Sequence, residues 1–177
     1  MRIIILIMIF SIQNMFSQGV INFSSARQTK NWSIVNDDVM GGVSTSKFYY
    51  DDNKAVFEGE ISLKNNGGFA SVRCNIKKIK VSPNHTINLL VNGDGKEYQI
   101  RIKKNKNDYF SYVHNFKTNG KNELITIQLS EFYPSFRGRK INKENYNHNQ
   151  IEQISVLFGN KVEEKFKLEI EKIFFNN

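Results

Sequence analysis

The chain has 177 residues, which suits one domain and excludes a large multidomain enzyme. Hydrophobic residues make up 40% of the chain and charged residues 24%, so the composition is that of a globular domain and not of a disordered segment. The formal net charge is +8, but most of the basic residues are lysine. Lysine, asparagine and isoleucine are abundant together, as A/T-rich codon usage would make them, so the charge alone predicts no nucleic-acid partner.

The N-terminal segment has the layout of a secretory signal peptide. Arg2 precedes a short apolar run over residues 3–10, and a polar segment follows. The run is too short for a bilayer span, which needs about 20 apolar residues. We therefore expect residues 1–19 to be a signal peptide that is cleaved after Ser17 or Gly19. The protein should then be exported, either periplasmic or secreted, with no membrane span left after cleavage.

Beyond residue 45 the chain repeats a half-apolar run followed by a turn signal. The run 97–103 shows the pattern: Tyr98, Ile100 and Ile102 point one way, whereas Arg101 and Lys103 point the other way. The predicted strands, in chain order, are 56–63, 69–76, 87–91, 97–103, 109–116, 124–129, 154–158 and 166–173. Lysines at strand ends and on polar strand faces protect sheet edges against aggregation, which accounts for much of the positive charge.

Glycine-containing turns separate the predicted strands. Residues 65–68 and 92–95 tolerate the positive φ of a tight turn, and each is predicted to close a hairpin. No convincing amphipathic helix is present, and the polar segment 142–150 is predicted to be a loop or a single turn. Many short strands with short turns indicate an all-β fold, a β-sandwich or jelly roll, formed by one domain over residues 20–177.

The single cysteine, Cys74, has no partner for an intrachain disulfide. It shares one face of its predicted strand with Val72, so it is expected to be a small buried hydrophobe. His85, His114 and His148 are scattered without a motif that would activate a nucleophile. Because paired carboxylates, metal-ligand spacing and a phosphate loop are also missing from the sequence, we predict no catalytic residues, no metal site and no cofactor, and the protein is not expected to be an enzyme.

Residues 31–44 stand out from the alternating strands. They combine the only tryptophan, Trp32, with adjacent carboxylates at Asp37 and Asp38 and with the glycine pair 41–42. The two carboxylates would either cap a turn by accepting backbone N–H groups or bind Ca²⁺ together with carbonyl oxygens. They lack the alternating spacing of a calcium loop, which favours capping. Trp32 would be either a core residue or a stacking platform for a ligand.

The segment 32–44, Trp-Ser-Ile-Val-Asn-Asp-Asp-Val-Met-Gly-Gly-Val-Ser, resembles the signature of the complex I intermediate-associated protein 30 family. The resemblance continues, in the family's order, through residues 57–62, 65–73, 93–98, 116–118, 132–139 and 166–173. It implies a jelly-roll β-sandwich of the galactose-binding-domain-like type, in agreement with the alternating strands. It also implies a non-catalytic assembly factor that acts through contact with a protein partner. The chain departs from the family pattern at Leu124 and Ser130, where members usually carry Trp and Pro.

Two functional classes remain open. The first is an exported, assembly-factor-like interaction module that holds a protein partner on a loop surface. The second is a carbohydrate-binding, lectin-like module, since galactose-binding-like sandwiches often recognise sugars with an aromatic ring, polar side chains and an arginine. The residues that would supply this ligand chemistry, if they converge, are Trp32, Asp37, Asp38, Arg73, Tyr98 and Arg137. In the alternative interpretation, the two arginines pair with Asp37, Asp38 or Glu58 and lock loops together.

Overall fold

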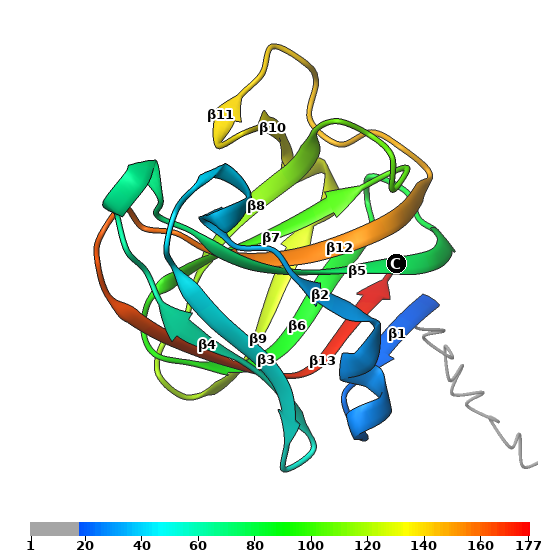
Figure 1. Cartoon of the computed structure of the whole chain (residues 1–177). Coiled ribbons are helices and arrows are strands. Elements are labelled where there is room, and N and C mark those ends of the chain that lie inside the picture. Colours follow the sequence, from blue (N-terminus) through cyan, green and yellow to red (C-terminus); the bar gives the residue numbers. More distant parts are fainter. Residues whose placement is uncertain (1–17) are drawn as a thin grey trace, which may run out of the picture.

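Two antiparallel sheets face each other across one hydrophobic core (Figure 1). The computed structural model describes residues 18–177, so the predicted signal peptide lies almost entirely outside the described residues. The six-stranded sheet has the order β3-β4-β13-β6-β9, and β1 pairs with the C-terminal half of β13. Its strands are β1 (Gln18–Asn22), β3 (Thr45–Asp51), β4 (Lys54–Glu60), β6 (Thr86–Gly93), β9 (Asn122–Gln128) and β13 (Lys165–Asn176).

The seven-stranded sheet has the order β11-β10-β8-β7-β12-β5-β2. Its strands are β2 (Trp32–Ile34), β5 (Ala70–Lys80), β7 (Glu97–Lys103), β8 (Ser111–Lys117), β10 (Tyr133–Phe136), β11 (Arg139–Lys140) and β12 (Gln150–Phe158). Short 3₁₀ helices interrupt the connections, namely η1 (Ala26–Asn31), η2 (Asp37–Met40), η3 (Lys64–Asn66) and η4 (Leu129–Glu131). None of the helices within residues 18–177 has the length and apolar character needed to cross a membrane.

The all-β sandwich and each strand predicted from alternation are confirmed, but the two predicted hairpins are wrong. The connection 65–68 leads from β4 to β5, and the connection 92–95 leads from β6 to β7. In both cases the two strands belong to different sheets, so the chain crosses from one layer to the other. Alternation indicates that one face of a strand is buried, but it does not indicate whether the next strand in the chain pairs beside it or lies in the opposite sheet.

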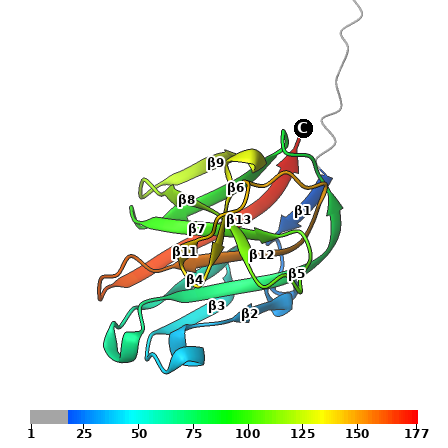
Figure 2. The same cartoon turned by 90° about the horizontal axis from the view of Figure 1, so that it is seen from above.

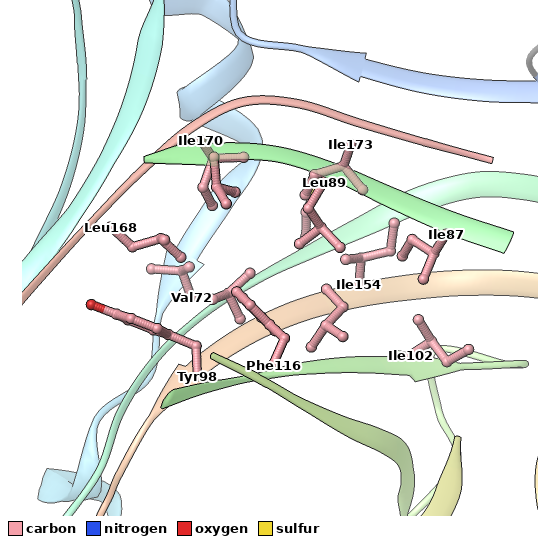
Figure 3. Close-up of a cluster of buried hydrophobic side chains, with 14 of the residues drawn as sticks. Val72, Ile87, Leu89, Tyr98, Ile102, Phe116, Ile154, Leu168, Ile170 and Ile173 are labelled. Atoms are coloured by element: carbon pink, nitrogen blue, oxygen red, sulfur yellow. The ribbon is translucent and has the colours of Figure 1, made fainter. Parts of the chain in front are cut away.

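The inward faces of the two sheets form a core of aliphatic and aromatic side chains (Figure 3). On β7 the predicted inward face, which includes Tyr98 and Ile102, is buried. Phe158 lies between Tyr98 and Phe166, with ring centroids 5.0 Å and 4.5 Å away. Each buried side chain of this size stabilises the fold by about 1.5–3 kcal/mol. Cys74 is free and buried, as predicted, so apolar packing holds the two layers together without a disulfide.

Candidate functional site

The carboxylate of Asp37, at the start of η2, is buried and surrounded by hydrogen-bond donors. Only 1% of Asp37 is exposed. Its Oδ1 accepts a hydrogen bond from the Ser44 amide at 3.0 Å, and its Oδ2 accepts one from the Ser44 hydroxyl at 2.5 Å. Oδ2 also accepts hydrogen bonds from the amides of Gly68 at 2.6 Å and Phe69 at 3.2 Å. Asp37 therefore joins the β2–β3 connection to the β4–β5 connection.

Both glycine pairs of the sequence pack around this carboxylate. A Cβ atom at Gly42 would lie 2.4 Å from Cγ of Asp37, and a Cβ atom at Gly67 would lie 2.7 Å from Oδ2 of Asp37. Gly41 and Gly68 have φ angles of 90° and 132°, a region that other residues rarely adopt. In each pair, one glycine therefore leaves room for Asp37 and the other allows the turn.

The capping interpretation of Asp37 is the one that the geometry supports. Burial raises the pKa of Asp37, but the hydrogen bonds from Ser44, Gly68 and Phe69 favour the charged form more strongly, and the net pKa is lowered. The lone pairs that a cation would need are already directed at N–H and O–H donors. Asp38 is exposed, and its Oδ1 accepts a hydrogen bond from the Val39 amide at 3.0 Å. No group of three His, Cys, Asp or Glu side chains within residues 18–177 is arranged to hold a metal ion.

The two connections that Asp37 links, together with the β12–β13 connection, present apolar side chains to solvent at one end of the sandwich. We call this the loop-end surface; its exposed fractions are 65% for Val39, 60% for Met40, 47% for Val43, 41% for Leu63 and 53% for Val162. The carboxylate Oε1 of Glu163 accepts hydrogen bonds from the Leu63 amide at 3.0 Å and the Ser62 hydroxyl at 3.2 Å, which ties the β12–β13 connection to the same end. Figure 2 shows η2, in blue, and η3, in teal, side by side at that end.

A second feature lies on the outer face of the seven-stranded sheet. We call it the cationic hollow; it has a volume of about 110 Å³ and is lined by Ser71, Arg73, Arg101, Lys103, Ser111, Gln153, Ser155 and Leu157. These residues come from β5, β7, β8 and β12, which are neighbours in the sheet. Strand pairing places Ser155 opposite both Arg73 and Arg101. The hollow therefore contains hydroxyl, amide and cationic groups, and no carboxylate lines it.

The structure does not bring the six predicted ligand-binding residues together. Trp32, with 9% exposed, packs against the rings of Phe23 and Phe48, so it is a core residue and not a stacking platform. Tyr98 is also in the core, where burial raises its pKa and its hydroxyl donates a hydrogen bond to Asp94. Asp37 is buried at the loop end, and Asp38 is exposed beside it.

Of the two predicted arginines, only Arg73 reaches the cationic hollow. Arg137 lies in the turn between β10 and β11, with its guanidinium 5.3 Å from the centre of the Phe136 ring. β11 and β2, the strand of Trp32, are at opposite edges of the seven-stranded sheet, which explains why the predicted set cannot converge. Within residues 18–177 neither arginine is within 4 Å of a carboxylate, so the predicted pairing with Asp37, Asp38 or Glu58 is wrong.

The sequence prediction missed Arg101 and Lys103 as members of a site. Both were expected on the polar face of their strand, and that face is indeed the outer one. Their proximity to Arg73 depends on β12, which lies between β5 and β7.

The two-layer sandwich is a jelly roll of the galactose-binding-domain-like type. The chain belongs to the complex I intermediate-associated protein 30 family, which it matches over residues 21–170. No curated protein matches the chain.

Solved structures with the same fold include carbohydrate-binding proteins. The family 11 carbohydrate-binding module from Clostridium thermocellum, in complex with a β-1,3-1,4-mixed-linked tetrasaccharide, is similar over 89% of this chain and 95% of the module, with 14% identity and a TM-score of 0.61. An agarase is similar over 88% of this chain and 25% of its own, with 12% identity and a TM-score of 0.56. The glycoside hydrolase domain of Endo-D from Streptococcus pneumoniae covers 81% of this chain with 21% of its own, at 11% identity and a TM-score of 0.51. At these identities the likeness shows the fold alone.

Replacing Asp37 by asparagine should lower the free energy of unfolding by about 2–4 kcal/mol at neutral pH, because an amide nitrogen would face backbone donors. The folded pKa of Asp37 is lowered from an ordinary value of 3.8. The stability that its charge contributes is therefore complete above that pH and is lost as the pH falls through the folded pKa. Urea denaturation of both proteins at neutral and strongly acidic pH measures this difference, which should shrink in acid.

Asp38→Asn is the matched control for this prediction, because Asp38 is exposed and makes one local hydrogen bond. Its effect on the free energy of unfolding should stay below about 1 kcal/mol. Equal losses for the two variants would contradict the role given to Asp37.

Proposed function

We propose that the protein is a non-catalytic interaction module that holds a protein partner on its loop-end surface. The observation that carries the proposal is the exposure of Val39, Met40, Val43, Leu63 and Val162 on neighbouring connections. Single apolar residues on a surface need no explanation, whereas apolar side chains gathered at one place mark interaction sites. Membership in a family of complex I intermediate-associated proteins supports a partner that is itself a protein.

The loop-end surface is suited to binding because its backbone is already ordered. Asp37 links its own β2–β3 connection to the β4–β5 connection, so a partner would not have to order these two connections on docking. Less of the binding free energy is then lost as conformational entropy. Met40 adds an unbranched side chain that adapts to irregular partner surfaces. No catalytic group takes part in this proposal, and the only thiol, Cys74, is buried with its pKa raised by burial.

Replacing Met40 by glutamate should reduce capture of the partner at least about tenfold, which corresponds to about 1.4 kcal/mol of binding free energy. A carboxylate at this position would lose its hydration inside an apolar interface. The measurement is affinity capture from the native host with tagged wild-type and variant proteins, followed by quantitative mass spectrometry.

Leu124→Glu is the matched control for this capture experiment. Leu124 is also an exposed apolar residue, at 55%, but it lies on β9 at the edge of the six-stranded sheet. A true partner is captured by the wild type and by Leu124→Glu and is lost from Met40→Glu. Equal capture by all three proteins would exclude the loop-end surface as the binding site.

Carbohydrate binding is the second candidate function. The cationic hollow favours it, since its hydroxyl, amide and guanidinium groups are the hydrogen-bonding groups that hold sugars in protein sites. The fold shared with a carbohydrate-binding module solved with a tetrasaccharide adds support. A glycan array tests this candidate separately from the loop-end surface, because only a sugar site predicts a signal there, and the absence of a signal would exclude it.

We also propose that the protein is exported, on the strength of the N-terminal sequence. N-terminal sequencing of the protein isolated from its host should then begin at Gln18 or Val20. An intact Met1 would contradict export. Cleavage after Ser17 would leave β1, which begins at Gln18, complete.

A further inference from the structure

The cationic hollow carries chemistry that the protein-partner proposal does not use. Arg73, Arg101 and Lys103 converge on it from β5 and β7, and none of the three forms an ion pair within the part of the chain that the structure describes. The ammonium group of Lys103 donates a hydrogen bond to the backbone oxygen of Asp108 at 2.6 Å. The two carboxylate oxygens of Asp108 accept hydrogen bonds from Asn105, at 3.1 Å and 3.4 Å.

Donor groups in the hollow remain available to a ligand. Arg101 uses Nε and Nη2 on the Oε1 atom of Gln99, at 3.0 Å and 2.6 Å, which leaves its Nη1 group free within residues 18–177. The guanidinium of Arg73 and the hydroxyl of Ser155 have no hydrogen-bond partner among the described residues. Ser155 is opposite both arginines in the sheet, so these donors lie at adjacent positions and line the same hollow.

The surroundings of Arg101 and Lys103 in the hollow disfavour their positive charges unless an anion is bound. Burial lowers the pKa of Lys103, and repulsion from Arg73 lowers it further, although Asp108 partly opposes both effects. Burial also lowers the pKa of Arg101. Like charges held close together in a partly desolvated place attract an anion strongly, because its charge offsets the repulsion of all of them. A volume of about 110 Å³ accommodates one oxyanion group.

We infer that the cationic hollow binds the carboxylate or sulfate group of an acidic glycan. A peptide fits this place poorly, because the strands around the hollow are paired on both sides and offer no free backbone groups for strand addition. The Ser71 hydroxyl donates to the backbone oxygen of Val35, and the Gln153 amide donates to Oδ1 of Asn75. The hydroxyls of Ser111 and Ser155 are therefore the groups beside the cations that suit the hydroxyl groups of a sugar ring. The inference rests on the carbohydrate candidate and narrows it to acidic glycans; it is independent of the loop-end surface.

Calorimetric titration of the protein with oligogalacturonate, a sulfated galactan oligosaccharide and a neutral mixed-linkage glucan oligosaccharide tests this inference. At least one acidic probe should bind, and the neutral probe should not. Arg101→Ala and Arg73→Ala should each lower the affinity for the acidic probe at least about tenfold, which is the scale of one charge-assisted hydrogen bond. Lys47→Ala is the charge-matched control, since Lys47 is exposed on the six-stranded sheet; it should leave the affinity unchanged. Circular dichroism checks each fold, and if Arg101→Ala does not fold, Arg73→Ala and Lys103→Ala provide the same comparison.

A comparison of the two acidic probes shows whether a carboxylate or a sulfate is preferred. Three results would overturn the inference: no binding of either acidic probe, equal binding of the neutral probe, or equal affinity in Arg73→Ala and the wild type. Stronger binding of a glutamate-rich peptide than of both acidic glycans would also overturn it and would assign the hollow to a protein. Met40→Glu tests protein capture by the loop-end surface in a separate experiment. Failure of the acidic-glycan proposal therefore leaves the protein-partner proposal standing, and the reverse also holds.

Discussion

The buried carboxylate of Asp37 is the constraint on which the arrangement of the loop end depends. The β2–β3 connection passes from the seven-stranded to the six-stranded sheet, and the β4–β5 connection passes back. Asp37 lies in the first connection and binds amides of the second. Ser44 extends the link, because its hydroxyl donates to Asp37 and accepts a hydrogen bond from the Ser62 amide at 3.0 Å. One side chain thus joins two crossings between the layers.

The protein carries two separate surfaces that differ in chemistry. The loop-end surface is apolar and is built on connections, whereas the cationic hollow is polar and is built on paired strands. Connections tolerate substitution and carry partner recognition, while a sheet face holds side chains at fixed spacing. A sandwich fold permits both kinds of site, so the fold by itself does not select between a protein partner and a glycan. The site chemistry and the proposed variants make that distinction.

The sequence predicted the local features well and the long-range ones poorly. Alternation located eight of the strands and the buried face of β7, because burial of one face is a local property, but it missed β1, β2, β3, β10 and β11. The adjacent carboxylates were expected to accept backbone N–H groups of a turn; Asp38 does so locally, whereas Asp37 accepts hydrogen bonds from amides of a distant connection. The sheet to which each strand belongs could not be predicted, and this error turned two crossings into hairpins. For the same reason the predicted ligand set included Trp32 and Tyr98, which are core residues, and omitted Arg101, which reaches Arg73 only through β12.

Asp37 holds the two crossings together, and amide hydrogen exchange tests this role most directly. In the wild type, the amides of Ser44, Gly68 and Phe69 should be protected because each donates to the carboxylate. In Asp37→Asn, protection at these amides should fall at least about tenfold more than protection in β12 and β13, since the loss is local before it is global. An equal loss of protection across the sheets and these three amides, or no loss at the three amides, would contradict the account.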